Sequence, residues 1–149
     1  MDDPYDLDRF VAAQSRDWER ARAELAAGRK TSHWIWYVFP QLRDLGRSPT
    51  AKRYGIGSLD EARAYRAHPT LGPRLVEATR LVCAAEGSAE EILGGTDAKK
   101  LRSSMTLFRR ADPEEPVFAA ALARFFGGAE DPATLALLAP DEGPKPDVD

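Results

Sequence analysis

The sequence predicts an all-α fold, and two observations lead to this prediction. Capping residues recur along the chain, each just before an apolar stretch with helical spacing, as expected where a helix begins. No segment alternates apolar and polar residues in the manner of a half-buried strand. We therefore assign residues 1–139 to one compact, bundle-like helical domain. Residues 140–149 are proline-rich and polar, and we expect them to form a disordered tail.

The first predicted helix ends just before Gly28, a residue suited to a C-terminal helix cap. Apolar residues recur along it at intervals of three and four, which marks one buried stripe. Gln14 falls in the middle of that stripe. Because a buried amide needs hydrogen-bond partners, Gln14 either braces another segment or faces a polar cavity. The stripe consists of Leu7, Phe10, Val11, Trp18, Ala21 and Leu25.

Residues 28–42 form the most unusual stretch, since four of the thirteen aromatic residues fall between Trp34 and Phe39. Aromatic residues favour strands, but no second strand pattern exists to pair with them. We therefore predict a short helix that Ser32 caps and that ends before Pro40. Its all-round apolar character predicts burial on several sides.

Most of the later helices are predicted from a cap and the apolar run that follows it. Proline follows several of these caps and fits the first helical position. One helix, over residues 71–82, is predicted from its apolar spacing alone. The predicted caps are Ser48, Ser58, Ser88, Thr96, Asp112 and Asp131.

The predicted helix over residues 96–110 carries polar groups on its apolar face. Counting at 100° per residue places Asp97 and Ser104 on that face and Lys100 at its margin. These groups are either structural partners within the fold or the lining of a polar pocket, and both interpretations stay open. The residues expected to face outward are Lys99, Arg102, Thr106 and Arg110.

Composition narrows the possible functions. The formal charge of −3 argues against general binding to nucleic acids or anionic membranes. One cysteine excludes an intramolecular disulfide and two histidines exclude a histidine-rich metal site, so we expect no metal and no cofactor. No segment reaches the roughly 18 apolar residues of a membrane span, and the first residues lack the apolar core of a signal peptide. We therefore expect a cytoplasmic protein.

Three long blocks resemble the signature of a bacterial family, the domain of unknown function 1810. They are residues 7–14, 28–41 and 97–108, which read LDRFVAAQ, GRKTSHWIWYVFPQ and DAKKLRSSMTLF. The resemblance extends from about residue 6 to residue 126. It implies a small, mainly helical, single-domain cytoplasmic protein without an assigned activity. Members are sometimes labelled calpastatin, but such an inhibitor is a long disordered chain, unlike this helix-capped, aromatic-rich sequence.

We predict a ligand site where the His33 segment meets the Asp97 helix. A lysine and the free N–H groups at a helix start attract anions, and a tryptophan can stack on a ring. The expected ligand is therefore anionic and contains a ring, such as a nucleotide or an ADP-ribose-like compound. If the protein is an enzyme, we expect hydrolysis with His33 or Asp97 as the general base. The predicted ligand-binding residues are Gln14, Lys30, Trp34, Trp36, Gln41, Lys100, Ser103 and Ser104.

This site prediction requires its polar side chains to converge on one solvent-reachable cavity. Two other functions stay open beside it. In one, the chain is a non-catalytic binding or regulatory protein, its inward polar residues are structural and its tryptophans fill the core. We expect core filling for at least one tryptophan in any case. In the other, an outward basic face binds nucleic acid, although such a face is ordinarily a solvated surface. That face consists of Arg102, Thr106, Arg109 and Arg110.

Overall fold

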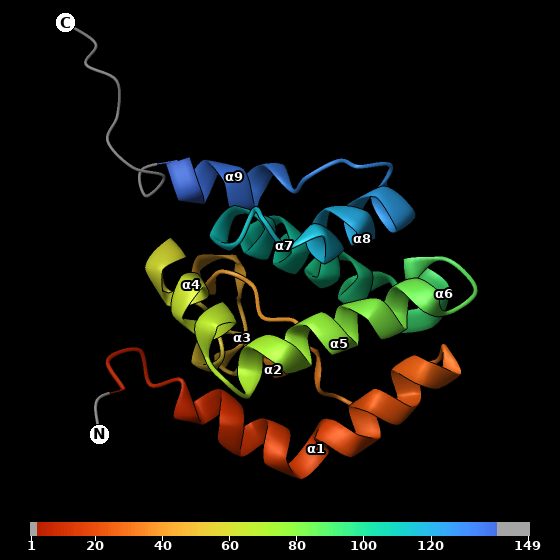
Figure 1. Ribbon diagram of the computed structural model, residues 1–149, viewed down its shortest axis with the longest axis horizontal. Coiled ribbons are helices and arrows are strands. Elements are labelled where there is room, and N and C mark those ends of the chain that lie inside the picture. Colours follow the sequence, from red (N-terminus) through yellow and green to blue (C-terminus); the bar gives the residue numbers. More distant parts are fainter. Residues whose placement is uncertain (1–2, 140–149) are drawn as a thin grey trace, which may run out of the picture.

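Residues 3–139, the part of the chain that the computed structural model describes, contain nine α-helices and one short 3₁₀ helix, and the all-α prediction is confirmed (Figure 1). The predicted tail, residues 140–149, lies outside the described residues. None of the helices within the described range is long and apolar enough to cross a membrane. The elements are α1 (Asp8–Ala27), α2 (Ile35–Val38), η1 (Arg43–Leu45), α3 (Pro49–Arg53), α4 (Leu59–Ala67), α5 (Leu71–Ala84), α6 (Ala89–Leu93), α7 (Gly95–Ala111), α8 (Pro116–Phe126) and α9 (Pro132–Leu138).

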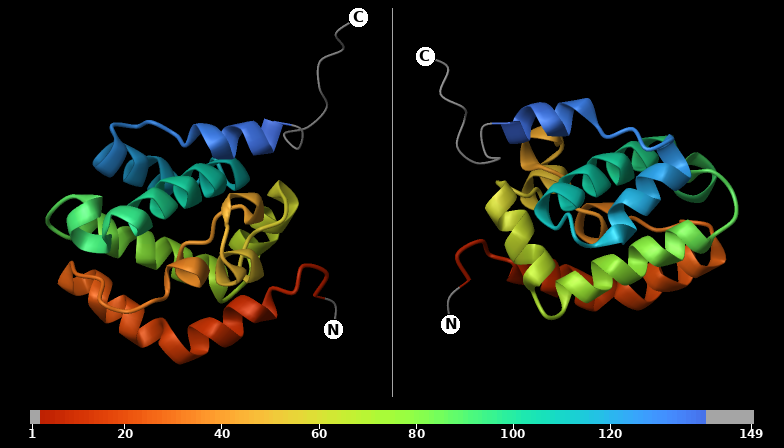
Figure 2. Two further views of the ribbon diagram at one scale, coloured as in Figure 1. Left: turned by 180° about the vertical axis from the view of Figure 1, so that it is seen from behind. Right: turned by 45° about the horizontal axis from the view of Figure 1, so that its top comes forward.

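Helix α7 is the centre of the fold, since α4, α6, α8 and α9 all pack against it. Helix α5 packs on α1, α4 and α8, and so joins the N-terminal helix to the rest. Figure 1 shows the resulting order, with α1 at the bottom, α5 and α7 in the middle and α9 at the top. In the right-hand view of Figure 2, α5 lies alongside α1, and α8 lies alongside α7. The apolar faces of these helices enclose one hydrophobic core.

Four of the predicted caps are confirmed. In each, the side-chain oxygen accepts the N–H of the third residue along the chain, as an N-cap does. Ser88 also belongs to a capping box, because the Glu91 side chain accepts the Ser88 N–H in return. The confirmed caps are Ser48, Ser58, Ser88 and Asp131.

Two predicted helix starts are wrong. Helix α7 begins one residue before Thr96, with Gly94 in the cap position and no side-chain cap. Gly94 has a φ of +91°, which glycine adopts readily, so the chain enters the helix earlier than the Thr96 signal predicts. Helix α8 begins after Glu115 rather than Asp112, because α7 continues further and Asp112 becomes its C-terminal cap.

Helix α2 lies in the aromatic stretch and ends before Pro40, as predicted. Its start differs, because Trp34 rather than Ser32 occupies the N-cap position and no side chain caps this end. The Ser32 hydroxyl instead donates to the Glu24 carboxylate at 2.6 Å, since a charged acceptor makes the stronger hydrogen bond. Burial on several sides is confirmed, because Trp36 alone among the four helical residues is partly exposed.

A parallel bridge between Leu42 and Ile56 closes the loop that contains η1 and α3. The Arg43 N–H donates to the Ile56 carbonyl at 2.8 Å, and the Ile56 N–H donates to the Gln41 carbonyl at 2.9 Å. A Cβ on Gly55 would lie 2.3 Å from the Arg43 Cα, so this close approach of two backbones requires glycine. The bridge holds η1 and α3 in place, and these elements form one wall of the candidate site.

Arg9 ties this loop to the N-terminal helix. Its guanidinium donates to the carbonyls of Arg53 and Gly55, each at 2.8 Å, and pairs with Glu61 on α4 at 2.8 Å. Both charged side chains are nearly buried, with 13% and 8% of their surface exposed. Because every charge here has partners, the desolvation cost of burying the pair is offset.

Candidate functional site

Two adjacent cavities open along the N-terminal half of α7. The larger, the α7–η1 cavity, has a volume of about 620 Å³ and lies between α7, the η1–α3 loop and the start of α9. The smaller, the α7 N-terminal cavity, has about 370 Å³ and lies between the start of α7 and the segment that links α1 to α2. Thr96 lines both, so the two cavities are neighbours. No place within residues 3–139 gathers three metal-ligating side chains.

The α7 N-terminal cavity brings together Lys30, His33 and Asp97. The Lys30 ammonium lies 2.6 Å from the Asp97 carboxylate, and both side chains are largely buried, with 7% and 16% exposed. The imidazole of His33 is exposed at the rim and makes no hydrogen bond to another described residue. Because Asp97 is held in an ion pair, His33 is the predicted base whose side chain is free to reach a ligand.

Glu24, near the C-terminal end of α1, holds residues 31–34 in place, although it was not among the predicted site residues. Its carboxylate accepts the N–H groups of Thr31 and Ser32 at 2.8 and 3.0 Å, the Ser32 hydroxyl at 2.6 Å and the Trp34 indole N–H at 2.9 Å. Burial raises the pKa of the Glu24 carboxyl, but these four hydrogen bonds outweigh burial and lower the pKa to about 2. The signal in the sequence is an acid at a helix end where the dipole disfavours one.

The lining of the α7–η1 cavity mixes apolar residues with charged ones, and three of the four charged residues are basic. Arg47 and Lys99 are exposed there, and neither forms an ion pair with another residue of the described chain. The Asp131 carboxylate has another role, because it caps α9 and accepts the Ser103 hydroxyl at 3.2 Å. The cavity therefore offers cations and hydrogen-bonding groups to an anionic ligand. Three predicted site residues line it: Gln41, Lys100 and Ser103.

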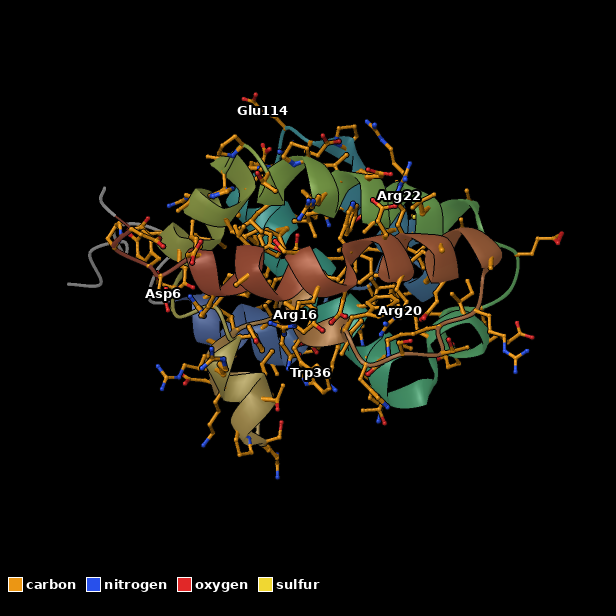
Figure 3. The ribbon with its side chains drawn as sticks, turned by 90° about the horizontal axis from the view of Figure 1, so that it is seen from below. Asp6, Arg16, Arg20, Arg22, Trp36 and Glu114 are labelled. Carbon is orange, nitrogen blue, oxygen red and sulfur yellow. The ribbon has the colours of Figure 1, made fainter. Side chains whose placement is uncertain are left out.

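Lys100 connects the two cavities. Its ammonium lies 3.5 Å from the Asp97 carboxylate and 5.5 Å from the ring centroid of Trp36. Asp97 therefore lies between Lys30 and Lys100 and pairs with both. Trp36 is partly exposed, and Figure 3 shows it on the face of the molecule that also carries Arg16. A cation beside an accessible indole suits a ligand that combines a ring with negative charge.

Three of the predicted site residues lie in the core and line neither cavity. Gln14 is 1% exposed and donates to the Tyr37 carbonyl at 2.6 Å and the Tyr65 hydroxyl at 3.0 Å, so it braces α2 against α4. Trp34 and Ser104 are fully buried. The prediction that all these side chains converge on one cavity is therefore wrong, and only the predicted residues along the two adjacent cavities and Trp36 beside them remain candidates. Gln14 is excluded because α2 packs against α1 and covers it. Trp34 confirms that at least one tryptophan fills the core.

The predicted outward face of α7 is covered by the segment that leads into α9. Thr106 is fully buried, and its hydroxyl accepts the Asp131 N–H at 2.9 Å. Arg102 donates to the Glu130 carbonyl at 2.8 Å, and Arg109 lies 3.7 Å from the Glu130 carboxylate. The prediction that Thr106 faces solvent is wrong, because helical counting does not show which helix face a later element covers.

Comparison with known proteins agrees with this fold. A model of the family described as "Protein of unknown function (DUF1810)" matches residues 4–138. The crystal structure of the conserved hypothetical protein Rv1873 from Mycobacterium tuberculosis is similar, with a TM-score of 0.90 and 57% identical residues. That similarity covers 92% of this chain and 99% of the other. No curated protein matches the sequence.

Proposed function

The chain belongs to the DUF1810 family, whose description assigns no activity, and from the site itself we propose that the protein binds a small anionic ligand that contains a ring. The ligand class is that of nucleotides and ADP-ribose-like compounds. Its ring lies against Trp36, and its phosphate lies in the α7–η1 cavity. The observation that carries this proposal is the position of Lys100, beside Trp36 and at the edge of a cavity of about 620 Å³.

The charges of the lining support a phosphate in this cavity. Lys100 lies 3.5 Å from Asp97, a looser contact than the 2.6 Å of Lys30, so its ammonium keeps donors for a ligand. Lys99 and Arg47 add two exposed cations on opposite walls. Charge-assisted hydrogen bonds from such groups to phosphate oxygens are stronger than neutral ones.

Trp36 provides the test, because it is partly exposed whereas Trp18 and Trp34 are buried. Titration with adenosine monophosphate, ADP-ribose and ribose 5-phosphate is followed by tryptophan fluorescence and by thermal unfolding. We expect the two compounds that carry a base to raise the melting temperature and to change the fluorescence. Lys100→Ala weakens binding about tenfold, and Trp36→Phe removes the fluorescence change. Arg63→Ala, an exposed arginine on α4, is the matched control.

Two results would contradict the proposal. One is the absence of stabilisation by every phosphorylated compound at millimolar concentration. The other is stabilisation that survives unchanged in a variant carrying both Lys100→Ala and Trp36→Ala, because the ligand would then lie elsewhere.

Hydrolysis of the bound compound is the second candidate function, and His33 is the observation that favours it. Its exposed imidazole lies at the rim of the neighbouring cavity, within the same site as Asp97. Chromatography of ADP-ribose and nucleotides after incubation with the protein measures product directly. Product that His33→Ala abolishes while binding persists supports a hydrolase. Binding without product supports the non-catalytic function, in which Asp97 serves to position the two lysines.

A further inference from the structure

We propose that the anionic ligand is part of a longer strand, and that the protein binds single-stranded nucleic acid. The strand follows three neighbouring cavities, which we call the basic groove. This inference rests on the proposed function of the α7–η1 cavity and extends it from one nucleotide to several.

The cavities of the basic groove are neighbours, because each shares a lining residue with the next. A third cavity, the bridge cavity, has about 520 Å³ and lies beside the bridge that joins Leu42 and Ile56. Gly46 lines both the bridge cavity and the α7–η1 cavity, as Thr96 lines the α7–η1 cavity and the α7 N-terminal cavity. Each cavity falls in the size range of a small-molecule site, so the groove offers three such places in succession.

Cations without carboxylate partners line this groove. Arg43 and Lys52 line the bridge cavity, and Arg47 and Lys99 line the α7–η1 cavity. All four side chains are exposed, and none forms an ion pair with another residue in the described range. Asp44 is an exposed acid on the bridge cavity, so cations outnumber acids there. A row of cations can replace the counterions of successive phosphates, which favours a polyanion over a single phosphate.

The overall charge of the chain does not oppose this inference. Residues 140–149 contain four acidic residues and one lysine, so their formal charge is −3. This equals the charge of the whole chain, and residues 1–139 therefore hold as many basic as acidic residues. The net negative charge thus comes from those ten residues, and the helical domain is formally neutral, so its binding of nucleic acid depends on where its cations lie.

The shape of the surface favours a single strand over a duplex. In a duplex the bases are paired and stacked inside, so a row of cavities would contact only the sugar–phosphate backbone. A single strand can turn its bases outward, place one against the Trp36 ring and seat others in the cavities. The outer face of α7 takes no part, because the segment before α9 covers it.

The test compares thymidine 5′-monophosphate with a fluorescein-labelled strand of six thymidylates, by fluorescence titration and anisotropy respectively. We expect the strand to bind at least about tenfold more tightly, because additional phosphates release additional counterions. Arg43→Ala with Lys52→Ala lowers the affinity for the strand about tenfold but changes the affinity for the monophosphate less than about twofold. Circular dichroism confirms that this variant folds. Arg63→Ala with Arg80→Ala, two exposed arginines on α4 and α5, is the matched control.

Salt dependence gives a second measurement on the same proteins. For a single strand, the slope of log K against log salt changes by about 0.7 for each phosphate contact. Loss of both Arg43 and Lys52 therefore reduces the slope by about 1.4. An unchanged slope contradicts the assignment of these two residues to the strand.

Each remaining outcome decides a different point. Binding of the monophosphate without tighter binding of the strand overturns this inference and leaves the proposed function standing. Failure of both probes to bind overturns both. Equal affinity for a hexaglutamate peptide overturns the nucleic-acid assignment, because charge alone would then explain binding. Equal affinity for a duplex overturns the choice of a single strand.

Discussion

The Glu24 carboxylate accepts the indole N–H of Trp34 at 2.9 Å, and so the end of α1 holds the start of the aromatic stretch. The same carboxylate accepts hydrogen bonds from Thr31 and Ser32. His33 lies between these anchored residues at the rim of the α7 N-terminal cavity. The geometry of that cavity therefore depends on a residue that does not line it.

Replacement of Glu24 with Gln tests this anchor. The amide keeps the shape of the side chain but loses the charge that strengthens four hydrogen bonds, so we expect the free energy of unfolding to fall by about 2 kcal/mol. Urea unfolding at neutral pH measures the change. Glu19→Gln, at an exposed position on the same helix, is the control and is expected to change stability by less than about 0.5 kcal/mol. A similarly small loss in Glu24→Gln would show that the anchor is not needed.

The lowered pKa of Glu24 predicts a pH dependence with a definite sign. Its folded-state pKa of about 2 lies below the ordinary value of 4.5. The stabilisation is therefore complete above about pH 4.5 and is lost as the pH falls from there towards 2. Across this window wild-type protein loses more stability than Glu24→Gln, which denaturant unfolding at each pH measures. Parallel stability curves for the two proteins would contradict the assignment.

Two tyrosines predict the behaviour at the alkaline end. Burial raises the pKa of Tyr65, and burial with a hydrogen bond to Asp17 raises the pKa of Tyr37. Folding favours the protonated form of both, so their contribution to stability is present below the ordinary pKa of 10 and is lost as the pH rises above it. In an ultraviolet absorbance titration, Tyr37 and Tyr65 ionise only as the protein unfolds. Tyr65→Phe and Tyr37→Phe each remove one of these late-ionising groups.

The ion pair of Lys30 and Asp97 predicts an asymmetric response to substitution. Asp97→Ala leaves the nearly buried Lys30 without its carboxylate, whereas Lys30→Ala leaves Asp97 its contact with Lys100. We therefore expect losses of about 3 kcal/mol for Asp97→Ala and about 2 kcal/mol for Lys30→Ala. The double variant loses less than the sum by about 1 kcal/mol. The exposed pair of Asp60 and Arg63 is the control, with a coupling below about 0.5 kcal/mol.

Gln14 separates a structural role from a ligand-binding role. Gln14→Leu leaves the Tyr37 carbonyl without its buried amide partner, so we expect a loss of about 2 kcal/mol in the free energy of unfolding. Affinity for adenosine monophosphate stays within about twofold of wild type, because Gln14 lines neither cavity. Ser15→Ala, at the next and exposed position, is the control for stability. A tenfold loss of affinity in Gln14→Leu would instead show that Gln14 takes part in ligand binding.

The helix starts show which features the sequence could predict. The caps of α6 and α9 are local signals, since Ser88 and Asp131 accept N–H groups only three residues away. The start of α7 follows from backbone conformation instead, since Gly94 turns the chain into the helix without a side-chain cap. Asp112 ends α7, so the cap of α8 is Glu115, whose carboxylate accepts the Val117 N–H. Local spacing was thus sufficient only where one capping residue was available.

The candidate site was predictable to a similar extent. Helical counting placed Asp97 and Lys100 on neighbouring faces of α7, and the structure joins them in one ion pair. Counting could not show what packs over each face. Thr106 is buried because the segment that leads into α9 covers it, and Trp34 is buried with its ring packed near that of Phe39. Arg47 was not predicted as a site residue, because it lies far from α7 in the sequence and only the folded chain brings its loop to that helix.

The bridge of Leu42 and Ile56 has a consequence for the rate at which a bound molecule leaves. Two backbone hydrogen bonds, the guanidinium of Arg9, the packing of Tyr54 on Phe10 and Tyr37, and contacts with α9 hold the loop over residues 43–55. Helix α7, in contrast, is packed by four helices. Local opening of the loop therefore costs less free energy than unfolding of the core. Amide hydrogen exchange in η1 and α3 is accordingly faster than in α7. That opening removes one wall of the groove, so a strand bound as proposed is expected to leave sideways no more slowly than the loop opens.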